Sequence, residues 1–84
     1  MGSEIDYDQK YFTSSELSLC SALIVLGFTL HSLEKDTPQR TIFIFKKSKE
    51  LNLAINDFWQ RKIRLDPLAY FEATRYLKSR IYGE

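Results

Sequence analysis

Residues 41–45 read Thr-Ile-Phe-Ile-Phe, and this stretch decides the fold. All five residues are β-branched or aromatic, which is typical of a strand that packs on both faces. We therefore expect a strand over residues 40–47. Residues 28–34 also have the pattern of a strand, and the segment 35–39 between the two contains Pro38. Two strands joined by such a short segment predict a β-hairpin.

The segment before the hairpin predicts a helix that begins at Thr13 and ends before Gly27. Thr13 and Glu16 have the spacing of a capping box, in which each side chain accepts a hydrogen bond from the other residue's backbone N–H. Phe12 and Leu17 stand where a hydrophobic staple would pack. Gly27 supplies the left-handed residue that often ends a helix. Apolar residues cover more than half of this helix, so we expect it at the centre of the core.

Two further helices are predicted in the C-terminal half. Ser48 is a suitable N-cap for the first, whose apolar stripe continues to about Arg61. Asp66 caps the second, and Pro67 occupies its first position, where a missing N–H costs nothing. A weak strand pattern over residues 7–12 precedes the first helix. The predicted fold is α+β: a small, mostly antiparallel three-stranded sheet packed with three helices, in the order β-α-β-β-α-α.

Length and composition indicate one small domain. The chain has 84 residues, of which 44% are hydrophobic and 14% aromatic, enough to bury a core without disulfides. We expect residues 1–6 to be disordered or tag-like and residues 7–82 to form a single α+β domain. The apolar stretch 19–30 is shorter than the roughly 18–20 residues that cross a bilayer. With no basic leader before an apolar segment, we expect a cytoplasmic protein with no membrane contact.

The residues that could carry catalysis or bind a metal are few. Ser14, Ser15, Ser18 and Cys20 are the candidate nucleophiles around the first helix, and His31 is the only histidine. The local signatures of nucleophilic enzymes, such as G-x-S-x-G, are absent from the sequence. One cysteine and one histidine cannot complete a zinc site. We therefore expect a non-enzymatic protein with no catalytic residues, no metal and no cofactor, in which Cys20 is an inert core residue with a raised pKa.

The charge distribution favours binding to nucleic acid. Residues 1–39 carry a net charge of −4 and residues 40–84 a net charge of +5. A basic surface can release counterions from a phosphate backbone, although the two halves could also simply attract each other. Phe43 and Phe45 share one strand face and either stack on bases or belong to the core. We expect the nucleic-acid contacts at Lys46, Lys47, Arg61, Lys62, Arg64, Arg75, Lys78 and Arg80.

Aromatic residues favour a second class of function, association with protein. Trp59 stands beside the main apolar stripe of its helix, and Tyr76 and Tyr82 lie among basic residues of the last predicted helix. Tyr and Trp anchors near Arg are typical of interface hot spots. The alternative expectation is therefore a homodimer or partner-binding domain, without nucleic-acid contact, that uses these three residues.

Several motifs occur in an order that resembles a known family. They are residues 11–17 (YFTSSEL), 26–28 (LGF), 42–45 (IFIF), 58–59 (FW), 64–67 (RLDP), 70–71 (YF) and 77–82 (LKSRIY). Together they span about residues 11–82 and resemble a family of small, uncharacterised domains from bacteria and their mobile elements. The resemblance implies a free-standing small domain in a mobile-element setting. It implies no catalytic or binding residues.

Overall fold

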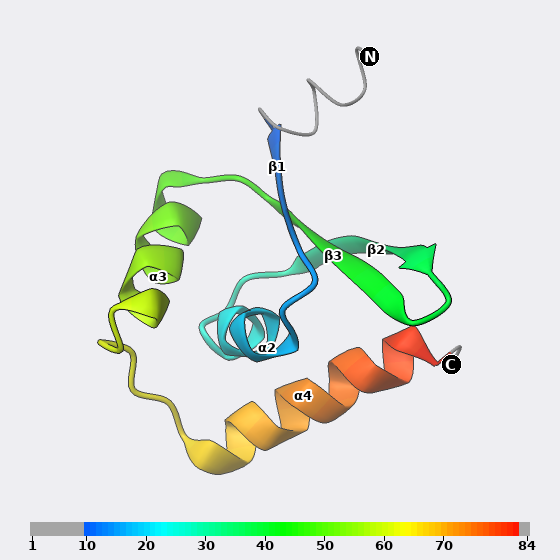
Figure 1. Cartoon of the computed structure of the whole chain (residues 1–84). Coiled ribbons are helices and arrows are strands. Elements are labelled where there is room, and N and C mark those ends of the chain that lie inside the picture. Colours follow the sequence, from blue (N-terminus) through cyan, green and yellow to red (C-terminus); the bar gives the residue numbers. More distant parts are fainter. Residues whose placement is uncertain (1–9, 83–84) are drawn as a thin grey trace.

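The computed structural model describes residues 10–82, which form one sheet and three helices (Figure 1). The order β-α-β-β-α-α and the α+β fold are as predicted. The expectations for residues 1–6, and residues 7–9 of the predicted first strand, lie outside the described residues. The elements are β1 (Tyr11–Ser14), α2 (Leu17–Val25), β2 (Leu30–Thr37), β3 (Arg40–Lys46), α3 (Lys49–Trp59) and α4 (Pro67–Ile81).

The Thr-Ile-Phe-Ile-Phe stretch forms the central strand of the sheet. β3 pairs antiparallel with β1 on one side and with β2 on the other. Phe45 lies opposite Phe12 and Leu30, and Phe43 lies opposite Leu33. Because directly opposed side chains share a face and positions two apart along a strand do as well, all five point to the same side. That side joins the hydrophobic core formed with the helices.

Helix α2 lies at the centre of the core, as its sequence predicts. Leu19 and Leu23 are buried and pack with apolar side chains of α3, α4 and the sheet. Two hydrogen bonds fasten α4 to it. The Thr74 hydroxyl donates to the buried Ser21 hydroxyl at 2.9 Å, and the Tyr70 hydroxyl donates to the Ser18 carbonyl at 3.1 Å. The second bond lies at the exposed edge of the contact, and together the two fix one turn of the first half of α4 against α2.

The start of α2 differs from the prediction, and the capping box at Thr13 is wrong. Thr13 belongs to β1, where it pairs with Ile44, and the helix begins only at Leu17. Glu16 is the N-cap residue, and its side chain makes no capping hydrogen bond. Its backbone N–H donates instead to the Ser14 hydroxyl at 3.0 Å. Pairing with β3 keeps residues 11–14 extended, and this tertiary interaction overrides the local helix signal.

The predicted starts of the other two helices agree with the structure, whereas α3 ends at Trp59, before the predicted end near Arg61. The Ser48 hydroxyl accepts from the Leu51 N–H at 3.0 Å at the start of α3. The Asp66 carboxylate accepts from the Ala69 N–H at 2.8 Å at the start of α4, with Pro67 in the first position. These caps satisfy N–H groups that a helix leaves without partners at its N-terminal end.

The hairpin is tighter than expected. Its turn consists of Pro38 and Gln39 alone, because Thr37 already pairs with Arg40. β2 therefore extends three residues beyond residue 34. It also begins two residues later than predicted, because Phe28 closes the end of α2 by donating its N–H to the Leu23 carbonyl at 3.0 Å. The hairpin thereby projects beyond the sheet toward the C-terminal turn of α4 (Figure 1).

Candidate binding surfaces

The eight predicted nucleic-acid-binding residues are all exposed and fall into three groups. Figure 1 shows the β3–α3 connection, the α3–α4 loop and the C-terminal half of α4 at three separate parts of the periphery. The structure therefore forms three local basic surfaces rather than one. Lys46 and Lys47 belong to the first, Arg61, Lys62 and Arg64 to the second, and Arg75, Lys78 and Arg80 to the third.

Phe43 and Phe45 do not form a platform on which bases could stack. Each is 1% exposed and belongs to the core beneath the helices. On the other face of the sheet, the rings of Tyr11 and His31 have their centres 4.7 Å apart. They come from β1 and β2, which lie on either side of β3 and are thus roughly 10 Å apart. The two rings must therefore lean toward each other across the central strand.

The face of α4 that points away from the core combines exposed aromatic and basic side chains. We call Leu68, Phe71, Arg75, Tyr76, Lys78, Arg80 and Tyr82 the α4 outer face. At 3.6 residues per turn, Tyr76 and Arg80 lie on one flank of it and the other five lie on the opposite flank. The three aromatic residues in it are 57%, 44% and 73% exposed, in chain order. The Arg75 guanidinium lies 5.8 Å from the centre of the Phe71 ring, and that of Arg80 lies 5.9 Å from the centre of the Tyr76 ring. Arg80 also donates to the Tyr76 hydroxyl at 3.0 Å. These contacts order the arginines beside open aromatic surface.

A second aromatic–basic pair lies where α3 ends. Trp59 is 57% exposed and meets the Phe58 ring edge-on, with ring centres 5.0 Å apart. Arg61 lines the same shallow hollow. Its φ of 62° is in the left-handed region, which costs a residue other than glycine roughly 1–2 kcal/mol. The Arg61 side chain is thus kept beside Trp59 in spite of an unfavourable backbone conformation.

Leu68 and Phe71 were not among the predicted interface residues. Their spacing from Arg75 and Tyr82 along the sequence is the pattern that could have identified them. Steps of three, four and seven residues place all four on one side of a helix, opposite the inward-facing Ala73 and Leu77. Tyr76 and Tyr82 were predicted as interface residues because basic residues flank them in the sequence.

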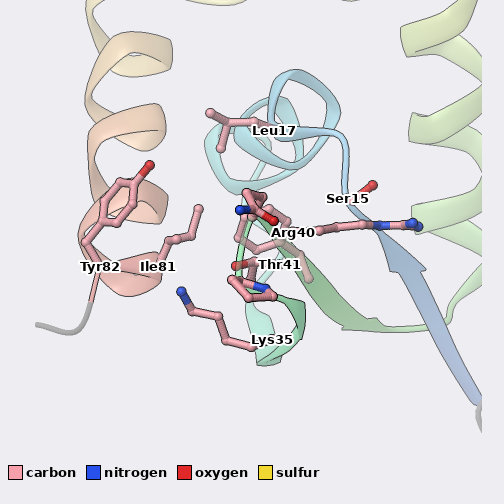
Figure 2. A pocket seen from close by; sticks show the side chains of 10 residues that line it. Ser15, Leu17, Lys35, Arg40, Thr41, Ile81 and Tyr82 are labelled. Atoms are coloured by element: carbon pink, nitrogen blue, oxygen red, sulfur yellow. The ribbon is translucent and has the colours of Figure 1, made fainter.

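A cleft of about 480 Å³ lies where the start of α2, the β2–β3 hairpin and the end of α4 meet (Figure 2). Leu17 and Ile81 supply apolar walls, and Lys35 and Arg40 supply positive charge. Ser15, a candidate nucleophile, stands at its edge. Because Ser15 is exposed and the described lining contains neither histidine nor cysteine, no side-chain base of that kind lies in the cleft to activate it. The sequence alone did not suggest this site, because its residues come from three distant segments.

Cys20 is an unreactive core residue, as expected. It is fully buried, and burial raises the pKa of its thiol from 9.0 to about 12. The charge of Glu16 adds to the increase, and a hydrogen bond with Ser14 partly opposes it. Since the thiolate is the reactive form of cysteine, the thiol has little nucleophilic character near neutral pH.

Two features are absent from residues 10–82, a metal-binding cluster and a membrane-spanning helix. No group of three or more His, Cys, Asp and Glu residues in this range could hold a metal ion. Within the same part of the chain, no helix is both long and apolar enough to cross a membrane.

Comparisons with known proteins place the chain in a family. No curated protein and no solved structure is detectably similar to it. A family model described as a domain of unknown function, DUF5659, matches residues 9–83. The match includes every strand and helix of the structure and all motifs that carried the resemblance noted in the sequence. The chain therefore belongs to the DUF5659 family.

Proposed function

We propose that this domain is a non-enzymatic binding module that contacts nucleic acid, or a nucleic-acid-processing complex, through the α4 outer face. The observation that carries the proposal is the pairing of exposed aromatic rings with arginines on both flanks of α4, Phe71 with Arg75 on one and Tyr76 with Arg80 on the other. Arginine neutralises phosphates, while exposed rings stack on bases. Single-stranded nucleic acid is the favoured ligand because its bases are free to stack.

The local charge of α4 supports the same proposal. Helix α4 contains three basic residues, Arg75, Lys78 and Arg80, against one acidic residue, Glu72, so it carries a net positive charge. The basic groups in the β3–α3 connection and the α3–α4 loop lie at other parts of the periphery. At physiological salt, charges more than about 8 Å apart are largely screened from each other. Those two groups would therefore guide a nucleic acid toward the protein and add outlying contacts, rather than complete the α4 site.

The proposal includes a cellular setting. The sequence resemblance implies a protein of bacteria and their mobile elements, and we place it in the cytoplasm, where such nucleic acids are processed. Co-occurrence of the gene with nucleic-acid-processing genes of mobile elements is the expected observation. A consistent neighbourhood of genes for secreted proteins would contradict this setting.

Fluorescence anisotropy with labelled single-stranded oligonucleotides tests the main proposal. Binding at low salt should weaken as salt rises, with a slope of log affinity against log salt of about −2, as expected for three contacts to a single strand. Phe71→Ala should weaken binding about tenfold or more through lost stacking. Arg75→Gln should make the slope shallower by about 0.7.

Lys49→Gln is the matched control, since it removes one exposed positive charge at the start of α3. It should change affinity much less than Arg75→Gln. Undetectable binding at low salt, or equal losses from the two substitutions, would contradict nucleic-acid binding by α4.

The second candidate function is association with a protein or a second copy of the chain, without nucleic acid. The exposure of Trp59, at 57%, favours it, because a large exposed indole beside an arginine is typical of an interface anchor. Sedimentation over a wide concentration range should then show a dimer that Trp59→Ala dissociates. A monomer at every concentration, with no partner retained on purification, would exclude this alternative.

A further inference from the structure

We infer that the cleft between α2, the β2–β3 hairpin and α4 is a binding site for a small organic anion with an apolar body. Its volume of about 480 Å³ falls in the range of small-molecule sites. Three segments far apart in the sequence build it, so its shape depends on the folded domain. The site lies beside the α4 outer face, with which it shares Tyr82, but its two cations, Lys35 and Arg40, belong to the hairpin and not to α4.

The charges of the cleft select an anion. Lys35 and Arg40 both line it, and the described lining residues include no acid. Arg40 makes an ion pair with Asp36, but its N–O distance of 3.8 Å is long and both side chains are at least half exposed. Exposed pairs of this kind contribute little energy. The Arg40 guanidinium therefore remains available to a ligand.

The walls of the cleft select an apolar body. Leu17, Phe43 and Ile81 line it, and because Phe43 is 1% exposed, the half-buried Leu17 and Ile81 supply most of the apolar surface that a ligand can reach. Thr41 and Tyr82 add hydroxyl groups that can orient a ligand by hydrogen bonds. An inorganic anion would leave the apolar wall in contact with water, and a neutral apolar molecule would gain no binding energy from the two cations.

The positions of the two cations indicate the shape of the ligand. In Figure 2, the Lys35 amine points toward Ile81 and Tyr82, whereas the Arg40 side chain extends the other way, toward Ser15. In this arrangement each cation offers its own position for an anionic group. A molecule with an anionic group at each end of an apolar body can place one group near each cation, so it should bind more tightly than its singly charged counterpart.

Titrations followed by two-dimensional amide NMR test this inference with four probes. They are a biphenyl dicarboxylate with one carboxylate at each end, the biphenyl monocarboxylate, the neutral biphenylmethanol, and inorganic phosphate. Shifts of the Thr41 and Ile81 amides should report binding at the cleft. Affinity should decrease in the order dicarboxylate, monocarboxylate, neutral alcohol, and phosphate alone should leave these amides unchanged.

Substitutions locate the site. Lys35 and Arg40 are exposed hairpin residues, so Lys35→Gln and Arg40→Gln should fold normally. Each should lower dicarboxylate affinity at least fivefold, while Lys49→Gln, which removes an equal charge outside the cleft, should change it less than twofold. Equal affinity for the neutral probe, unshifted Thr41 and Ile81 amides, or equal effects of Lys35→Gln and Lys49→Gln would overturn the inference.

Discussion

Helices α2 and α3 end with the same pair of backbone hydrogen bonds, yet they place different residues in the left-handed position. In α2 that residue is Gly27, with φ 103°, and in α3 it is Arg61, with φ 62°. The Gly27 N–H donates to the Ile24 carbonyl, and the Arg61 N–H donates to the Phe58 carbonyl, at 3.0 and 3.1 Å. Glycine adopts such a conformation without steric cost, whereas arginine does not.

The two helices also differ in what stabilises them. α2 buries Leu19, Cys20 and Leu23 and begins without a side-chain cap. α3 buries only Leu51 completely but begins with the Ser48 cap. Tertiary burial thus holds α2, while local hydrogen bonds contribute a larger share to α3. Helix α2 is therefore adapted to the core, whereas the end of α3 holds an exposed arginine in a backbone conformation that arginine disfavours.

Truncating a leucine in each helix should give the largest difference. Leu23→Ala should lower the free energy of unfolding by about 3 kcal/mol, because Leu23 is fully buried and its loss leaves a cavity. Leu53→Ala in α3, where the side chain is 58% exposed, should change it by about 0.5 kcal/mol or less. Urea unfolding measures both. Similar losses at the two positions would show that α3 is as much a core helix as α2.

Gly27→Ala should come next and should destabilise the domain by roughly 1–2 kcal/mol. A methyl group at Gly27 would meet no atom within 4 Å, so the cost is purely conformational. The crystal or solution structure of the variant should otherwise be unchanged. If the variant were as stable as the parent, the backbone at the end of α2 would accommodate a side chain at no cost in stability. Gly27 and Arg61 would then no longer differ in the conformational cost of the left-handed position.

The buried thiol of α2 should make stability depend on alkaline pH. The pKa of Cys20 is raised from 9.0 to about 12, so its stabilising effect is complete below pH 9 and is lost as pH rises toward 12. At pH 10 the loss relative to pH 7 should be about 1.4 kcal/mol, because only the unfolded thiol ionises there. Urea unfolding at the two pH values, with Cys20→Ala as the control for other groups, isolates this effect. An identical pH dependence in the control would contradict it.

Arg61→Gly should have the smallest effect and the opposite sign. Glycine relieves the left-handed strain but loses more entropy on folding, so the net gain should be about 0.5 kcal/mol. Thermal unfolding at a fixed protein concentration measures it. If the variant is less stable than the parent, contacts of the Arg61 side chain stabilise the fold by more than its left-handed backbone conformation costs. The presence of arginine at this position would then be explained by stability alone.

The elements that sequence analysis located correctly depend on nearby residues. Ser48 and Asp66 cap helices by accepting from N–H groups three positions away. Around Gly27, the N–H groups that close α2 donate to carbonyls three to five positions earlier. The predicted helix start at Thr13 was wrong because Thr13 belongs to β1, which pairs with a strand some thirty residues later. A local sequence pattern cannot show that capping of a helix competes with pairing to a distant strand, and in this structure strand pairing is favoured.

The candidate sites divide in the same way. Arg75, Tyr76 and Arg80 could be recognised as neighbours because they lie within two turns of one helix. The burial of Phe43 and Phe45 could not be decided from the strand alone, since either face of a central strand can be covered.

The sequence by itself determined the element types, their order and most of their ends, because caps, turns and hydrophobic periodicity act over a few residues. Only the tertiary structure decided where β1 and α2 divide, since strand pairing competes with capping there. It also decided that the basic residues form three surfaces and that Leu17, Lys35 and Ile81 share a cleft. These arrangements follow from how the sheet and helices pack, and packing joins residues whose separation along the chain carries no local signal.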